Sequence, residues 1–249
     1  MPKARWVYVV SGGVAMLFAA QLAMAGTIVL TFDELGVIPG SGEPILNFYN
    51  GGFAGNGTPS CGYTVCGPGP NYGITFVSNA LALTSENQGG GGNFTNEPSS
   101  PNVMFFLTGS GDVMNVPGGI TKGFSFYYSG NSAVGNGVVD VYSGLNGTGT
   151  LLASFTVNTS LTPLCTSGPA YCVWQPDGVS FSGTAESVVF GGAANFIGWD
   201  NVTLGSASPV VPEPSSLILL STGLAGLAAT KLRRRRQRQS QSTEGARNS

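Results

Sequence analysis

The sequence predicts an all-β protein, a β-sandwich built from short strands, on three observations. Glycine is very frequent, with 39 residues, and charged residues make up only 9% of the 249-residue chain. This composition favours many tight turns and few long helices. Short apolar runs recur between turn-forming residues at the spacing expected of a sandwich, and no helical periodicity occurs between Gly26 and Pro209. We expect one domain over residues 26–205, with a core of its own.

Eleven segments have the length and composition of strands. They are 27–32, 74–78, 80–85, 103–107, 112–116, 124–128, 138–142, 151–157, 178–182, 187–191 and 197–204. The pair Asn146-Gly147 lies between two of them and is a strong hairpin signal. The segment 124–128 alternates aromatic residues with serine and tyrosine, so we expect it to be buried on one face only. A loop at 87–101 with four successive glycines is expected to be mobile.

The first 25 residues have the organisation of a secretory signal peptide with an apolar signal helix. Lys3 and Arg5 form the charged region, 6–22 is apolar, and Ala23-Met24-Ala25 is an A-x-A cleavage site. The mature protein is therefore expected to start at Gly26. The alternative is an uncleaved N-terminal anchor.

The last forty residues follow a different plan, in three successive parts. A small-residue linker at 206–211 leads to Val211-Pro212-Glu213-Pro214, where the prolines favour an extended backbone. The apolar stretch 217–232 would span about 24 Å as a transmembrane helix, slightly short of a ~30 Å hydrocarbon core. Arg233, Arg234, Arg235 and Arg236 would stop transfer and stay cytoplasmic. Residues 239–249 are expected to be a disordered cytoplasmic tail.

This order of parts, over 212–238, resembles the PEP-CTERM sorting signal of exopolysaccharide-producing Gram-negative bacteria. The residues that carry the resemblance are Val211 to Pro214, the apolar helix, and Arg233 to Arg236. It implies that an exosortase recognises and removes the tail. The protein would pass through the inner membrane, stay there transiently, and become a cell-surface or extracellular protein. The alternative is an ordinary membrane anchor, which would leave an uncleaved, tethered adhesin.

The charge of the middle segment limits the partners that it can bind. Between Gly26 and Pro209 there are ten acidic residues and one basic residue, Lys122, a net charge of −9. Such a surface repels nucleic acid and suits divalent cations where acids converge.

The expected export bears on the four cysteines, because it would place them in an oxidising compartment. There we expect two local disulfides, Cys61–Cys66 and Cys165–Cys172. Zinc binding is the competing interpretation, although the spacings are not C-x-x-C.

The chain has no histidine, which excludes Ser-His-Asp and Cys-His nucleophiles and a histidine base. A glycosidase needs only two carboxylates, so a secreted polysaccharide-active hydrolase stays as the alternative. We expect no catalytic activity. Aromatic residues at 36–72, including Phe48, Tyr49 and Tyr72, would either stack on a sugar or pack the loop onto the sandwich. The interpretation we favour is a surface or matrix protein associated with exopolysaccharide or biofilm.

Two short segments resemble the first and last strands of exported jelly-roll domains of the carbohydrate-binding, galactose-binding-like type. They are Thr31-Phe32-Asp33-Glu34 and the segment 197–202, which contains Asp200-Asn201. The resemblance implies a β-sandwich of the jelly-roll type whose terminal strands lie close together and share a structural Ca²⁺. By position the ligands would be Asp33, Glu34 and Asp200, with Asn201 as a further candidate. The alternative is that Asp33 and Asp200 only cap turns.

Overall fold

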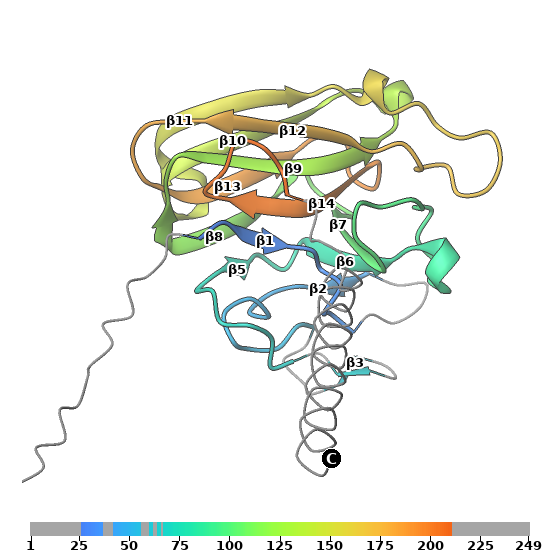
Figure 1. Ribbon diagram of the computed structural model, residues 1–249, viewed down its shortest axis with the longest axis horizontal. Helices are drawn as coiled ribbons and strands as arrows, with labels where there is room; N and C mark the ends of the chain where they lie inside the picture. Colours follow the sequence, from blue (N-terminus) through green and yellow to red (C-terminus); the bar gives the residue numbers. More distant parts are fainter. Residues whose placement is uncertain (1–25, 37–41, 56–59, 62–63, 66, 211–249) are drawn as a thin grey trace, which may run out of the picture.

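The described part of the chain forms two antiparallel β-sheets that pack face to face (Figure 1). The computed structural model describes residues 26–36, 42–55, 60–61, 64–65 and 67–210. The expected signal peptide, sorting motif, transmembrane helix and arginine cluster lie outside these residues. Within them, no helix is long and apolar enough to cross a membrane.

The larger sheet has seven strands in the order β12-β9-β14-β7-β6-β2, with β1 pairing to β14. Its strands are β1 (Ile28–Leu30), β2 (Glu43–Pro44), β6 (Ala80–Thr84), β7 (Asn102–Phe106), β9 (Gly123–Gly130), β12 (Gln175–Ser180) and β14 (Ile197–Leu204). The second sheet has the order β11-β10-β13-β8-β5. Its strands are β5 (Thr75–Phe76), β8 (Gly111–Ile120), β10 (Gly137–Gly144), β11 (Thr148–Val157) and β13 (Ala185–Gly191).

Small elements complete the fold. A two-stranded hairpin, β3 (Ser60–Cys61) and β4 (Thr64–Val65), lies in the long connection between β2 and β5. The 3₁₀ turns are η1 (Glu86–Gln88), η2 (Ser132–Val134), η3 (Leu145–Gly147) and η4 (Thr159–Leu161). Since the only helical elements of the described residues are these short turns, the all-β prediction is confirmed.

Each of the eleven predicted strands overlaps an observed strand, and the predicted hairpin is also present. Strands β10 and β11 pair across η3, where Asn146 and Gly147 both have positive φ, 57° and 67°. Two successive residues with positive φ form the kind of tight turn whose twist matches that of the flanking strands. The strands that sequence analysis missed, β2, β3 and β4, have two residues each, too few to show a period.

Aromatic side chains dominate the core between the sheets. Trp199 of β14 is fully buried, stacked on Phe106 at 5.7 Å between ring centroids and edge-on to Phe190 at 5.5 Å. Phe48 and Tyr49, from the connection between β2 and β5, join the same core, with 3% and 1% exposure. Of the two interpretations of the loop aromatics, packing is therefore correct for these two residues.

The prediction that 124–128 is buried on one face only is wrong. Phe124, Phe126 and Tyr128 face the core as expected, but Ser125 on the outer face has 0% exposure. The Ser125 hydroxyl donates to the carbonyl oxygen of Ser206 at 2.9 Å, because the segment that leaves β14 turns back over this face. A local pattern of alternation cannot reveal a distant segment that covers the polar side.

Candidate functional site

The first and last strands are neighbours, as the resemblance implied. Strands β1 and β14 pair antiparallel with Leu30 opposite Val202. The register between β14 and β9 shifts between Asp200 and Thr203, and Asn201 has a positive φ of 47°. This is a β-bulge, which adds one residue and re-aims the side chains beside it. The bulge brings Asp200 and Asn201 to the same partner, Ser99.

Asp33, which follows β1, and Asp200 converge on the segment 99–102. The Ser99 amide and hydroxyl donate to Asp200 at 2.8 and 3.0 Å, and the Asn102 amide donates to Asp33 Oδ1 at 3.0 Å. The Asn102 side chain donates to the backbone oxygens of Phe32 and Leu35 at 2.9 and 2.8 Å. The two carboxylates therefore fasten the 99–102 segment to both ends of the sandwich chain.

Burial makes this carboxylate pair hard to ionise. Desolvation raises the pKa of Asp33 to about 6, against the opposing effect of the Asn102 amide. Desolvation also raises the pKa of Asp200 well above its usual value, and the nearby charge of Asp33 adds to the rise. Both shifts favour the protonated form of these carboxyl groups, and a bound cation would oppose them.

Glu34, next to Asp33 in the chain, makes hydrogen bonds of its own. Its side chain is exposed, and Oε2 accepts from the hydroxyls of Thr31 and Tyr49, both at 3.4 Å. The described residues contain no group of three or more His, Cys, Asp or Glu side chains placed to hold a metal. Oxygen donors available at the pair are the two carboxylates, the Ser99 hydroxyl and Asn201 Oδ1. Sequence analysis missed Ser99 and Asn102, because a polar residue in a Gly/Pro-rich loop carries no distinguishing local signal.

A groove of about 610 Å³ opens on the outer face of the larger sheet. Its floor consists of outward-facing residues of β6 and β7, namely Leu81, Leu83 and Phe105. Its walls come from the glycine-rich loop at 91–94, from Tyr171, and from Asn195-Phe196 just before β14. None of the described residues that line it is charged.

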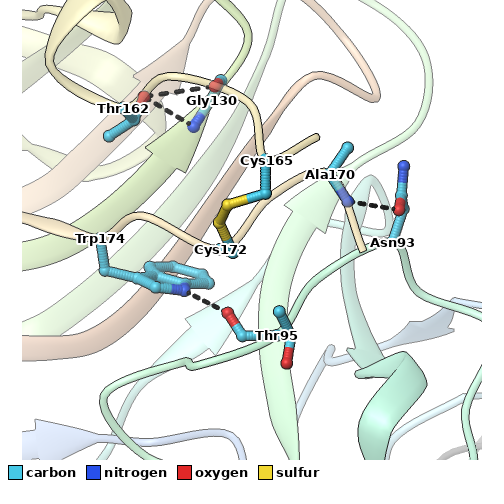
Figure 2. The surroundings of a disulfide bond; sticks show 8 residues. All are labelled: Asn93, Thr95, Gly130, Thr162, Cys165, Ala170, Cys172 and Trp174. Carbon is cyan, nitrogen blue, oxygen red and sulfur yellow. Dashed lines mark hydrogen bonds between the residues drawn. A yellow bond between two sulfur atoms is a disulfide. The ribbon is translucent and has the colours of Figure 1, made fainter. Parts of the chain in front are cut away.

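Two loops that form the walls of the groove are joined to each other (Figure 2). The Ala170 amide donates to Asn93 Oδ1 at 2.8 Å, and Trp174 Nε1 donates to the Thr95 carbonyl at 3.0 Å. Phe94 packs on Tyr171 with ring centroids 4.9 Å apart. Within the loop 87–101, segment 93–95 thus has fixed contacts with the second loop.

The disulfide Cys165–Cys172 closes the second of these loops, as predicted from the spacing (Figure 2). The Cys165 amide also donates to the Ala170 carbonyl at 2.9 Å inside the closed loop. The disulfide thus stiffens the wall that carries Tyr171. The other predicted pair, Cys61–Cys66, lies outside the described side chains and stays a prediction.

Glycine at position 198 lets the outer loop reach the sheet. A Cβ at Gly198 would lie only 2.5 Å from Cε1 of Phe94, so the Phe94 ring rests directly on the backbone of β14. Phe94 is 4% exposed there and belongs to a second apolar cluster, separate from the main core. The groove is therefore bounded by packed aromatic side chains, not by loose loops.

The C-terminal tail has a recognised match. Residues 210–236 match the PEP-CTERM protein-sorting motif, in agreement with the resemblance found in the sequence. This motif indicates export and C-terminal processing to the cell surface or extracellular space. No relative was found among curated protein sequences.

Three solved structures illustrate the similarity of the described domain to other proteins. The K2 cleaved adhesin domain of Lys-gingipain has a TM-score of 0.41 at 13% identity, over 73% of this chain and 99% of that chain. The catalytic domain of a GH87 α-1,3-glucanase with tetrasaccharides scores 0.35 at 13% identity, over 58% and 30%. TmCBM61 with β-1,4-galactotriose scores 0.31 at 12% identity, over 53% and 84%. Because every score is below 0.5, these similarities assign neither a ligand nor an activity to this chain.

Proposed function

We propose that this chain is an exported, exosortase-processed β-sandwich of the jelly-roll type that acts without catalysis and binds neutral polysaccharide in the extracellular matrix. The observation that carries the proposal is the uncharged groove on the outer face of the larger sheet. It combines apolar surface with side-chain amides, the mixture that small polar ligands with apolar faces require.

The chemistry of the groove fits a sugar chain. Leu107 is 51% exposed in the groove lining, where it can contact the C–H face of a hexose ring. The exposed amides of Asn93 and Asn195 can exchange hydrogen bonds with hydroxyl groups. Since the domain around the groove has a net charge of −9, an anionic glycan would be repelled and a neutral one would not.

The arrangement of carboxylates supports the absence of hydrolase activity. A glycosidase places two carboxyl groups on either side of a bond, in a site that substrate can enter. Asp33 and Asp200 converge on one segment, but Asp200 has 0% exposure and its oxygens accept from Ser99 and Asn201. Among the described residues, the groove and two smaller pockets are lined by at most one carboxylate each, which is Glu34 in one of them.

We further propose that Asp33 and Asp200 hold a structural Ca²⁺, with Ser99 and Asn201 supplying further oxygens. The convergence of one buried and one partly buried carboxylate on the segment 99–102 supports this proposal, because hard cations prefer carboxylate, hydroxyl and carbonyl oxygens. Glu34 would join only if its side chain turned away from Tyr49. Bound calcium would neutralise the pair and fasten the two ends of the chain.

A matched pair of substitutions tests the groove. Leu107→Asp places a charge in the groove, and Leu151→Asp places the same charge on β11 of the other sheet, at a leucine of similar exposure, 49%. In affinity electrophoresis against neutral and anionic polysaccharides, wild type and Leu151→Asp should bind a neutral glycan and Leu107→Asp should not. Equal binding by both variants, or binding to no polysaccharide, would refute the groove. Release of reducing ends would favour the hydrolase.

A further inference from the structure

The segment between the last strand and the sorting motif is bound to the domain along its length. The Gly205 amide donates to the Gly123 carbonyl at 3.0 Å, and the Ser125 hydroxyl donates to the Ser206 carbonyl at 2.9 Å. At the far end, the Val210 amide donates to the Thr203 hydroxyl at 3.2 Å. A turn closed by Ser206 Oγ, which accepts from the Ser208 amide at 3.1 Å, lies between them.

Missing side chains on the sheet make room for this segment. A Cβ at Gly178 of β12 would collide with the carbonyl oxygen of Ala207, and a Cβ at Gly123 would lie 2.6 Å from the Ala207 nitrogen. Glycine inside a strand commonly marks such a close approach of another backbone. The strip of Gly123, Ser125, Gly178 and Thr203, here called the linker clamp, is thus shaped to hold residues 205–210.

Burial confirms that the contact is continuous. Ser125 and Thr203 face away from the main core, and each has 0% exposure, since segment 205–210 covers them. Small polar residues on an outer sheet face would otherwise be in water. The linker predicted from composition is a bound strap in the described structure.

The clamp determines how far the sorting motif can reach. The motif match begins at residue 210, whose amide is held by the clamp and which is the last residue that the structure describes. From there, six residues lead to the apolar stretch that starts at Leu217, a span of at most about 20 Å. Release of the strap from Gly205 would double the free chain to about 40 Å.

We propose that the linker clamp restrains processing of the tail, so that the exosortase acts on the released strap. A protease needs the residues beside its cleavage motif free and extended in its own active site, and the clamp holds Val210 and its neighbours on the sheet. Cleavage then proceeds in proportion to the released fraction, as in any equilibrium where a partner binds only the minor state. This inference rests on the sorting motif and not on the proposed glycan groove.

The test compares the rate of tail processing in full-length variants expressed with the cognate exosortase. Gly178→Ala should push the strap off the sheet, and Ser125→Ala should remove one hydrogen bond. Gly118→Ala is the matched control, because a Cβ at Gly118 meets no atom within 4 Å. Loss of one hydrogen bond should speed processing about fivefold for Ser125→Ala. We expect a larger increase for Gly178→Ala and none for Gly118→Ala.

A second measurement keeps the result interpretable. Precursor purified from cells without the exosortase is digested briefly with a nonspecific protease, and cleavage within 205–210 is followed by mass spectrometry. The wild type and Gly118→Ala should resist cleavage within 205–210, whereas Gly178→Ala and Ser125→Ala should be cut there. All four proteins should still unfold cooperatively on heating. The proposal is overturned if the wild-type strap is already cut freely. It is equally overturned if a variant with a freed strap is processed at the wild-type rate.

Discussion

Asp112 should make the stability of this domain fall as pH rises. It lies on the core-facing side of β8, opposite Phe190 of β13, with 1% exposure. Its Oδ1 accepts from the Val113 amide at 2.6 Å, and its Oδ2 has no hydrogen-bond partner within the described residues. Desolvation raises the pKa of Asp112 from 3.8 to about 7. The folded state therefore keeps a proton that the unfolded chain releases.

The size and sign of the effect follow from this shift. Between pH 4 and 7 the folded state binds more protons than the unfolded state, so the free energy of unfolding decreases as pH rises. A shift of about three pKa units corresponds to roughly 4 kcal/mol above pH 7, of which roughly 3 kcal/mol is lost between pH 5 and 8. That is a large share of the ~5–15 kcal/mol that holds a typical domain folded.

Asp112→Asn tests this reasoning, because asparagine keeps the shape and the acceptor for the Val113 amide but cannot ionise. Urea unfolding of residues 26–210 at pH 5 and pH 8 should give the variant a clear gain over wild type at pH 8 and a smaller one at pH 5. Asp140→Asn, on the outer side of β10, should keep the wild-type slope. The reasoning is refuted if Asp112→Asn and wild type lose stability equally over this range.

Three further predictions address calcium, the disulfide and the tail. Millimolar calcium should raise the melting temperature of wild type and leave that of Asp200→Asn unchanged. At a hundred times Kd, binding adds about 2.7 kcal/mol to the free energy of unfolding. An unchanged melting temperature of wild type would count against the site. Replacing Cys165 and Cys172 by serine should cost about 2 to 3 kcal/mol in thermal unfolding, and no loss would mean the loop is held by its hydrogen bonds alone. Mass spectrometry of surface-located protein should find no peptide from Arg233–Arg236, and an intact arginine cluster would show that the tail is retained.

The sequence predicted the strands well where a strand has an apolar face of its own. The predicted segment 197–204 coincides with β14, and each other predicted segment overlaps a strand. Strand β12 was placed three residues late at its start, because its Gln-Pro-Asp beginning lacks apolar residues. Two-residue strands such as β2 depend on their partners and not on local propensity.

Of the candidate sites, sequence reasoning found individual residues but not the surfaces that they form. Asp33 and Asp200 were identified from the resemblance of the two short segments that contain them, yet Ser99 of the connecting segment 99–102 lies 101 residues from Asp200. The groove combines residues from β6, β7 and two loops that have no sequence pattern in common. Long-range assemblies of this kind depend on the strand order, which local periodicity does not encode.

A single irregularity in β14 connects the features discussed above. Trp199 and Val202 both point into the core although they are three residues apart, so the bulge between them supplies the extra residue. At the bulge, Asp200 and Asn201 reach Ser99. After the bulge, side chains alternate again between the two faces of the sheet, so Thr203 points outward and its hydroxyl accepts from the Val210 amide. Without the extra residue, Thr203 would face the core and the strap would lose its last anchor. The bulge therefore positions both the carboxylate pair and the linker that precedes the sorting motif.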